Sequence, residues 1–347
     1  MSKIKVGLVG FGFSGATFHA PLISVLEEFK IEKVVSSNKE KVQQYFSEVE
    51  VVNNLEEVLE DETIDLVVIT TPSGLHYEMA KQSLKGGKHV ILEKPMVVEV
   101  WEAEELIQIA EEKNLLLSVY HNRRWDNDYL TVKKLIGDGV LGEVNTYQVH
   151  YDRYRPEVRD RWREKQGPGS GVLYDLGSHL IDQALDLFGS PQFILADVLA
   201  QRENAETDDY FHIILGYEKL RVILHSGSMI TSQGPRFQVH GSKGSFIKYG
   251  LDGQEAALKE GKKPINHSWG ADDPRNYGML VTMDGEKEKQ ETIETLQGSY
   301  TTYYKKIAES IFEGKIAPVT AHEGLLVIKI IEAALKSSRE KKAILLN

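Results

Sequence analysis

The sequence predicts an α/β protein in which an N-terminal doubly wound domain precedes a C-terminal α+β domain with a large open, mainly antiparallel sheet. At 347 residues the chain is longer than a single hydrophobic core usually organises. Up to about Tyr120, short apolar runs alternate with segments of helical spacing, whereas beyond Arg123 apolar residues alternate along longer stretches. We therefore expect two domains, 1–122 and 123–347.

The N-terminal domain is expected to hold a parallel sheet covered by helices. Continuous apolar runs are typical of strands that are buried on both faces. Such runs occupy Lys5–Val9, Glu32–Ser36, Asp65–Thr70, His89–Leu92 and Leu115–Val119. Apolar residues at helical spacing predict helices over His76–Lys85 and Glu99–Lys113.

The C-terminal domain begins with an expected helix over Tyr129–Gly137 and then changes to period-two alternation, which is typical of antiparallel sheets with one face on the core. The expected strands are Glu143–Arg153, Phe193–Arg202, Tyr210–Tyr217, Leu220–Gly227, Arg236–His240, Ser245–Tyr249 and Gln290–Thr295. Two closing helices, Ser299–Phe312 and His322–Ser337, are candidates to pack back on the first domain. Leu251–Gly278 is expected to be a long loop over the cleft or the surface.

The composition excludes several classes of function. The net charge of -11 opposes binding to nucleic acid and other polyanions. The sequence contains no cysteine, which excludes disulfides, thiol catalysis and cysteine metal sites. No apolar run approaches the roughly 20 residues of a membrane helix. We expect a cytoplasmic protein without nucleic-acid or membrane partners.

A dinucleotide site is predicted directly after the first expected strand. Gly10, Gly12 and Gly15 form a G-x-G-x-x-G element there, with Phe13 and Ser14 between the last two glycines. Glycines at this position permit a tight turn and the close approach of a pyrophosphate to a helix N-terminus, as in a Rossmann domain. A plain glycine-rich turn is the alternative. Methyltransferases open with similar turns, so the motif alone does not choose between hydride and methyl transfer.

The end of the second expected strand indicates which dinucleotide is bound. NAD enzymes place an acidic residue there to accept the ribose hydroxyls. This chain instead has Ser36 and Ser37, an amide, and the nearby Lys39 and Lys41, which offer donors to a 2′-phosphate. NADP(H) is therefore the expected cofactor and NAD is the alternative. Solvated lysines without a specific role would also explain the two cations.

Two further segments resemble the Gfo/Idh/MocA oxidoreductases, the family of glucose-fructose oxidoreductase and inositol dehydrogenase. They are Thr70-Thr71-Pro72-Ser73-Gly74-Leu75-His76 and the stretch from Gly86 to Glu93-Lys94-Pro95. The resemblance implies that Lys94 assists proton movement and touches both cofactor and substrate. It also implies cofactor contacts by residues that follow the strands, namely Thr71, Pro72, His76, Glu93, Lys94 and Asn122.

An acid/base pair is expected in the second domain. Asp175 and His179 are four residues apart, which on a helix places both side chains on one face. Oxidation of a secondary alcohol needs a base for the hydroxyl proton, and histidine titrates near neutrality. His179 is therefore the candidate acid/base, Asp175 the candidate to bind the substrate hydroxyl, and Asp182 a candidate to orient the ring. No metal site is expected, because these carboxylates and histidines match no zinc spacing.

Residues 12–21, 120–125 and 153–163 extend the resemblance toward the NADP-dependent scyllo-inositol dehydrogenase branch of the family. Guanidinium and indole groups suit a polyol, because they donate hydrogen bonds to hydroxyls and pack on C–H surfaces. A charged, solvated loop would explain the composition of residues 153–163 equally well. The expected substrate-binding residues are Arg123, Arg155, Arg161, Trp162, Trp269 and Tyr277.

These observations together predict an NADP(H)-dependent dehydrogenase of a cyclic polyol such as scyllo-inositol. Oxidation of a hexose or pentose by the same groups is the first alternative, and a non-catalytic nucleotide sensor is the second. A broad antiparallel sheet should have its exposed face covered, so we expect a homo-dimer or homo-tetramer built through the second domain.

Overall fold

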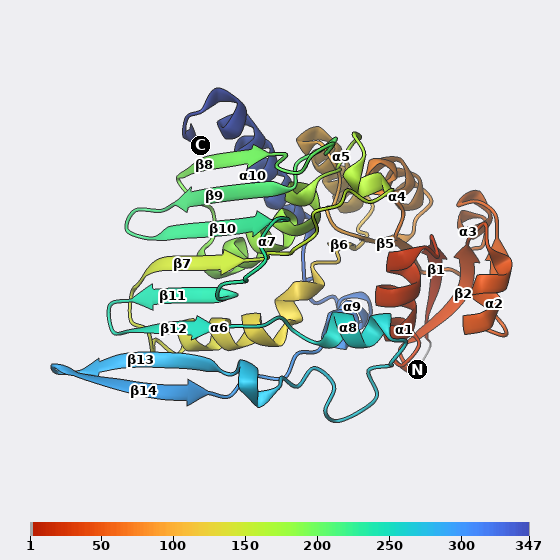
Figure 1. Ribbon diagram of the computed structural model, residues 1–347. Helices are drawn as coiled ribbons and strands as arrows, with labels where there is room; N and C mark the ends of the chain where they lie inside the picture. The colour runs from red at the N-terminus through yellow and green to blue at the C-terminus, as the bar shows by residue number, and fades with distance from the viewer. Residues whose placement is uncertain (1–2, 347) are drawn as a thin grey trace. The chain divides into compact units, whose positions relative to one another are not determined.

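The computed structural model describes residues 3–346, which form two compact units (Figure 1). Unit 1 contains the chain up to Asn122, together with Gln254–Trp269 and Ser299–Leu325. Unit 2 contains Arg123–Gly253, Gly270–Gly298 and the remainder from Leu326. The expected domain limits also include residues 1, 2 and 347, which lie outside the described residues.

Unit 1 is built on a six-stranded sheet in the order β3-β2-β1-β4-β5-β6, in which every adjacent pair is parallel. All residues of β4 and nearly all of β1 are buried, as their continuous apolar sequence predicts. The strand order reverses between β1 and β4, which is where doubly wound folds bind ligands. The strands are β1 (Ile4–Val9), β2 (Phe29–Val35), β3 (Glu50–Val52), β4 (Leu66–Ile69), β5 (His89–Leu92) and β6 (Leu117–Val119).

Helices follow the strands of unit 1, and two later segments of the chain join them. A capping box between Glu99 and Glu102 sets the start of α5. The expectation of a loop over Leu251–Gly278 is wrong for its first part, because α8 lies there. The helices are η1 (Gly15–His19), α1 (Ala20–Ile23), α2 (Lys39–Tyr45), α3 (Glu56–Leu59), η2 (Ser73–Leu75), α4 (His76–Lys85), α5 (Val100–Glu112), α8 (Gln254–Lys259) and α9 (Thr301–Glu313).

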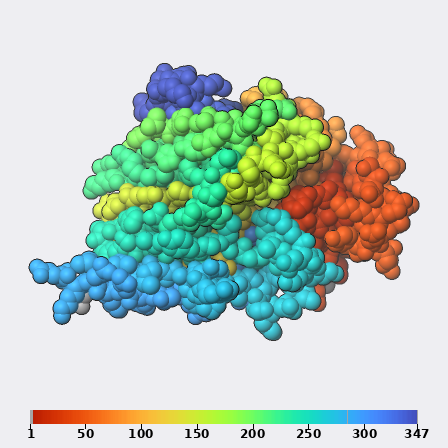
Figure 2. Space-filling view, in the orientation of Figure 1, coloured from red at the N-terminus to blue at the C-terminus, as the bar shows by residue number. Residues whose placement is uncertain are grey.

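Unit 2 contains a nine-stranded sheet in the order β14-β13-β12-β11-β7-β10-β9-β8-β15. Only β7 and β10 pair in parallel, so the sheet is mainly antiparallel as predicted. In Figure 2 the β13–β14 hairpin (blue) extends past the neighbouring strands of this sheet. The strands are β7 (Val144–His150), β8 (Phe193–Leu199), β9 (Tyr210–Gly216), β10 (Arg221–Gly227), β11 (Phe237–Gly241), β12 (Gly244–Lys248), β13 (Gly278–Asp284), β14 (Lys287–Ile293) and β15 (Ile344–Leu345).

One face of this sheet packs on helices. Buried and half-exposed residues alternate along β9 and β10, which is the pattern of a sheet with a single core face. Phe188 of α7 packs edge-on against Tyr147 of β7, and α7 lies behind the sheet in Figure 1. The remaining helices are η3 (Asn122–Trp125), α6 (Asn127–Gly137), η4 (Trp162–Glu164), η5 (Leu173–Gly177), α7 (Ser178–Phe188), η6 (Pro274–Asn276) and α10 (Ala321–Glu340).

Within the described residues, no helix combines the length and the apolar character that a membrane span requires.

Candidate active site

The glycine-rich turn of unit 1 joins β1 to η1 and is open at its centre. Gly10 has a φ of 95°, and a side chain there would meet Thr70 at 3.0 Å. A Cβ on Gly15 would lie 2.2 Å from the carbonyl oxygen of Gly10, so close packing requires this glycine as well. A Cβ on Gly12, by contrast, would meet no atom within 4 Å. Open space beside the main chain is what the approach of a pyrophosphate needs, so the turn fits a dinucleotide.

A buried hydrogen-bond network ties this turn to the segment after β5. One carboxylate oxygen of Glu93 accepts a hydrogen bond from the Ser14 hydroxyl and lies 3.1 Å from His19 Nε2. The other oxygen accepts from the main-chain N–H of Lys94 at 2.8 Å. Burial by itself would raise the pKa of Glu93, but the hydrogen bond and charge of His19, the charge of Lys94 and the Ser14 hydroxyl lower it to about 2. His19 Nδ1 lies 2.5 Å from the Tyr304 hydroxyl, which extends the network into α9.

His76 also links two turns, those that follow β4 and β5. Its ring is buried, with Nε2 at 2.9 Å from the carbonyl oxygen of Thr71 and Nδ1 at 3.0 Å from that of Pro95. Burial lowers the pKa of His76, whereas the hydrogen bonds to the Thr71 and Pro95 carbonyls and the charge of Glu93 raise it. His76 is expected from the sequence to contact the cofactor together with Thr71 and Pro72. In the structure its ring nitrogens face main-chain carbonyls, which makes it a positioning residue for the two turns.

The end of β2 brings a hydroxyl and a cation toward the glycine-rich turn. The Ser36 hydroxyl accepts a hydrogen bond from the N–H of Asn38 at 3.1 Å. Asn38 caps α2 by accepting the N–H of Lys41 at 2.9 Å. The Lys41 ammonium donates to the carbonyl oxygen of Phe11 in the glycine-rich turn at 3.0 Å. These donors fit a 2′-phosphate on a dinucleotide held by the turn.

Lys94 and Asn122 lie at the carboxyl edge of the unit 1 sheet, where doubly wound folds bind ligands. Lys94 comes two residues after the end of β5 and is half-buried, and its peptide bond to Pro95 is cis. Asn122 comes three residues after the end of β6 and is buried. The position of both residues is therefore the one that a cofactor-binding role requires.

Unit 2 contains a polar pocket around Asp175. Arg163 Nε lies 3.4 Å from Asp175 Oδ1. Burial, together with the charges of other arginines, lowers the pKa of Arg155 to about 10. Burial raises the pKa of Asp208 to about 6, against several hydrogen bonds that lower it. The pocket brings Asp175 together with two of the expected substrate residues. Its lining residues are Arg153, Arg155, Arg161, Arg163, Glu164, Gly171, Val172, Asp175, Arg202, Asp208 and Ser228.

The expected acid/base pair does not share one regular α-helix. His179 is buried in the first turn of α7, whereas Asp175 lies in η5, which is a π-helix. A π-turn is wider than an α-turn, so the spacing of four residues does not fix the two side chains on one face as the sequence suggests. Asp182 is bound to Arg124 by two hydrogen bonds of 2.9 and 2.7 Å, and this ion pair is buried. Asp182 therefore anchors η3 to α7.

Five of the expected substrate residues have local partners, and Arg161 is one of them, because its Nε donates to Glu164 at 2.6 Å. Arg123 is buried and donates to Asp126 and to the Tyr151 hydroxyl. The Arg163 guanidinium stacks over the Trp162 ring at 4.5 Å. Two more residues belong to different units: Trp269 of unit 1 donates to Gln254 at 3.0 Å, and Tyr277 of unit 2 donates to Glu294 at 3.2 Å.

Two residues beside the glycine-rich turn are given no role by the sequence motifs. His19 lies within residues 12–21 of the family resemblance, and the structure shows that it holds Glu93 in place. Lys259 of α8 lies 5.6 Å from the ring centre of Phe13, although more than two hundred residues separate them. A helix hidden in an expected loop therefore contributes to the surroundings of the turn.

Comparison with known proteins assigns both halves of the chain to one family. Residues 4–121 match the Gfo/Idh/MocA model described as an oxidoreductase family with an NAD-binding Rossmann fold, and residues 133–346 match its C-terminal alpha/beta domain. The scyllo-inositol 2-dehydrogenase (NADP(+)) IolW of Bacillus subtilis strain 168 is 58% identical over 346 residues, which cover 100% of this chain and 97% of that protein.

Solved structures agree with this assignment and confirm the predicted fold class. The structure of yvaA from Bacillus subtilis has a TM-score of 0.98 and 58% identity, with 99% of each chain covered. That of YPO2259 from Yersinia pestis has a TM-score of 0.95 and 40% identity, with 99% of this chain and 97% of that chain covered. The chain therefore belongs to the Gfo/Idh/MocA family of oxidoreductases.

Proposed function

We propose that this oxidoreductase uses NADP(H) to transfer hydride to or from a secondary alcohol or ketone of a cyclic polyol such as scyllo-inositol. The observation that carries the proposal is the 58% identity, over the whole chain, to a scyllo-inositol 2-dehydrogenase (NADP(+)). The local chemistry supports it, since hydroxyl and ammonium donors follow β2 where an NAD enzyme has an acidic residue.

The cofactor-binding roles follow from unit 1. The main chain at Gly12 faces the pyrophosphate, and Ser36 and Lys41 bind the 2′-phosphate. Ser37, with an exposed side chain, is a further donor at the same strand end. When bound, the nicotinamide supplies the donor or acceptor for the hydride.

The proposed proton transfer uses an imidazole and an ammonium group. His179 takes the hydroxyl proton when the alcohol is oxidised and returns it when the ketone is reduced. Lys94 donates a hydrogen bond to the reacting oxygen and assists the same proton transfer. Asp175 binds a neighbouring hydroxyl, and Arg155 and Arg161 of its pocket donate to further hydroxyls of the ring.

A substrate panel tests the function. The purified protein is mixed with NADPH or NADH and a series of inososes, ketohexoses and ketopentoses, and loss of the reduced-cofactor absorbance is followed. We expect turnover with an inosose and a clear preference for NADPH. Turnover with a ketose alone would replace the polyol by a sugar, and inactivity with every carbonyl compound would overturn the proposal in favour of a nucleotide sensor.

Two variants test the assigned chemistry. His179→Ala and Lys94→Ala should each lower kcat by roughly two to four orders of magnitude, and the Kd for NADPH should change little in His179→Ala. His322→Ala is the matched control, because that imidazole is exposed and pairs with the exposed Glu111 on the unit 1 surface. Near wild-type turnover in either of the first two variants would end the corresponding assignment.

A further inference from the structure

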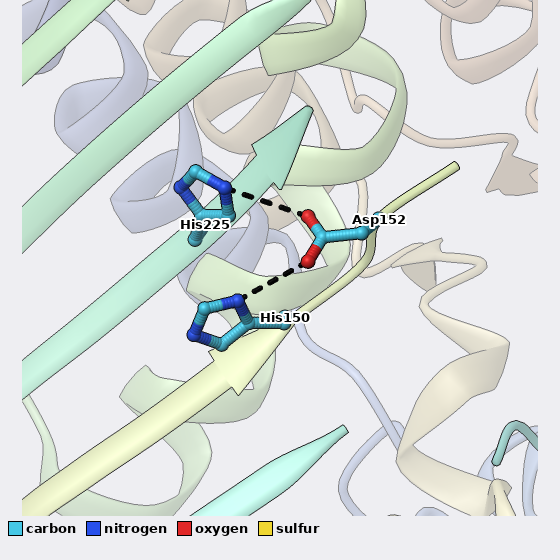
Figure 3. A group of neighbouring side chains, drawn as sticks. All are labelled: His150, Asp152 and His225. Carbon is cyan, nitrogen blue, oxygen red and sulfur yellow. Dashed lines mark hydrogen bonds and ion pairs between the residues drawn. The ribbon is translucent and has the colours of Figure 1, made fainter. Parts of the chain in front are cut away.

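Three histidines lie side by side on the face of the unit 2 sheet opposite α7. His212 of β9 is in register with His225 of β10, and His225 is in register with His150 of β7. Residues in register on adjacent strands point to the same face. Asp152 follows His150 by two residues and turns to that face as well, so that its carboxylate lies between two of the rings (Figure 3).

The distances around Asp152 differ from those of an ordinary ion pair. Oδ2 lies 3.3 Å from His150 Nδ1, and Oδ1 lies 3.5 Å from His225 Nε2. A charge-assisted hydrogen bond between nitrogen and oxygen would measure about 2.7–2.9 Å. Nitrogen and oxygen atoms bound at roughly 2.0–2.1 Å to a tetrahedral Zn²⁺ are instead about 3.3 Å apart. One ligand atom from each of the three side chains lies within 4.8 Å of the others, so small side-chain rotations complete the site.

Neighbouring groups orient the carboxylate and one of the rings. The N–H of Gly227 donates to Asp152 Oδ1 at 3.2 Å. His225 Nδ1 lies 3.4 Å from His212 Nδ1, and when His225 donates this hydrogen bond its Nε2 carries a lone pair directed at the carboxylate. A lone pair and a carboxylate oxygen repel each other unless a cation lies between them. Metal-ligating histidines characteristically use their second nitrogen in such a bond.

From this geometry we infer that His150, Asp152 and His225 bind a divalent transition-metal ion of the Zn²⁺ class, with a fourth position for water. Two imidazoles and one carboxylate, in a chain without cysteine, are ligands that suit Zn²⁺, Co²⁺ and Ni²⁺. The ion joins the ends of the parallel strands β7 and β10. It stabilises unit 2, and none of its ligands is a residue proposed for hydride transfer. The inference is therefore independent of the proposed function.

No metal site is expected from the sequence, because it contains no short metal-binding motif. The residues of this cluster form no such motif either. His150 and Asp152 come from one end of β7, whereas His225 comes from β10, and only the parallel pairing of the two strands brings them together.

Titration of the full-length, chelator-treated protein with Co²⁺ tests the site, because tetrahedral Co²⁺ absorbs visibly. We expect saturation at one Co²⁺ per chain and its displacement by Zn²⁺. His225→Ala and Asp152→Asn should each weaken binding at least about 100-fold, since the loss of a second-shell group alone costs 10- to 100-fold. Asn retains an oxygen that accepts the N–H of Gly227, so Asp152→Asn preserves the local main chain.

His240→Ala is the matched control. This histidine lies on β11 of the same sheet and hydrogen-bonds Ser245. Its variant should bind Co²⁺ as the wild type does, and Zn²⁺ should raise the Tm of the wild type and of His240→Ala but not of His225→Ala. Absence of saturable binding, or equal binding by the wild type and His225→Ala, would overturn the inference. Equal loss in His240→Ala would also overturn it, because the metal would then bind the surface without a defined site.

Discussion

Gly12→Ala should separate cofactor binding from folding, because the structure leaves room for a methyl group at this glycine. Gly12 has no positive φ, and a Cβ there meets no atom within 4 Å. The free energy of unfolding without cofactor should therefore change by less than about 1 kcal/mol. The methyl group would occupy the space assigned to the pyrophosphate and remove a hydrogen bond to a charged group, about 1.5–3 kcal/mol. The affinity for NADPH should then fall roughly 10- to 100-fold.

Gly15→Ala, unlike Gly12→Ala, should lower the free energy of unfolding. Its Cβ would lie 2.2 Å from the carbonyl oxygen of Gly10, which is main chain and must shift. We expect a loss of about 1–3 kcal/mol in unfolding free energy. Urea unfolding without cofactor and fluorescence titration with NADPH measure the two quantities for both variants. A Gly12→Ala protein that binds NADPH as tightly as the wild type would refute the placement of the pyrophosphate at this turn.

Two further substitutions test charges in unit 1. Ser36→Asp should raise the Kd for NADPH at least about tenfold and leave that for NADH nearly unchanged, because the new carboxylate repels the 2′-phosphate; equal affinities before and after the change would place the phosphate elsewhere. Glu93→Gln should lower the unfolding free energy by about 3 kcal/mol near pH 7, since folding lowers the pKa of Glu93 from 4.5 to about 2. That contribution is complete above pH 4.5 and is lost as the pH falls toward 2, so the difference between variant and wild type in urea unfolding should shrink over this range. A difference that is independent of pH would show that the charge of Glu93 is not what stabilises the fold.

The elements that can be predicted from the sequence are those with a clear burial pattern. The apolar runs of β4 and β5 predict buried parallel strands, and the alternation along β9 and β10 predicts a sheet with one core face. β3 carries little signal, because only one of its three residues is buried. β14 is predicted only in its second half, by the expected strand Gln290–Thr295, because six of its seven residues are exposed and main-chain pairing to β13 holds it. Burial therefore leaves a clearer record in the sequence than the main-chain pairing of an edge strand does.

Pro21 shows how a local irregularity hides from sequence patterns. A proline inside the helix that follows a glycine-rich turn should kink or delay that helix. In the structure, Gly15–His19 form the π-helix η1, and α1 starts at Ala20 with Pro21 in its first turn. A proline costs no hydrogen bond there, because the first N–H groups of a helix have no partner within it. The sequence indicates that the helix is irregular at Pro21, but it does not predict the π-helix that precedes this residue.

The candidate site depends on contacts between segments that the sequence leaves far apart. The glycine motif predicts where a pyrophosphate binds, but the Ser14 hydroxyl that fixes this turn donates to Glu93, 79 residues later. Glu93 also accepts the N–H of Lys94, so one carboxylate holds both the cofactor turn and the main chain of the proposed proton-transfer residue. This carboxylate is buried, and the Ser14 hydroxyl, the N–H of Lys94 and the His19 ring surround its oxygens. The charge of Glu93 is thus used to align two parts of the site, and a change there should disturb NADPH binding and turnover together.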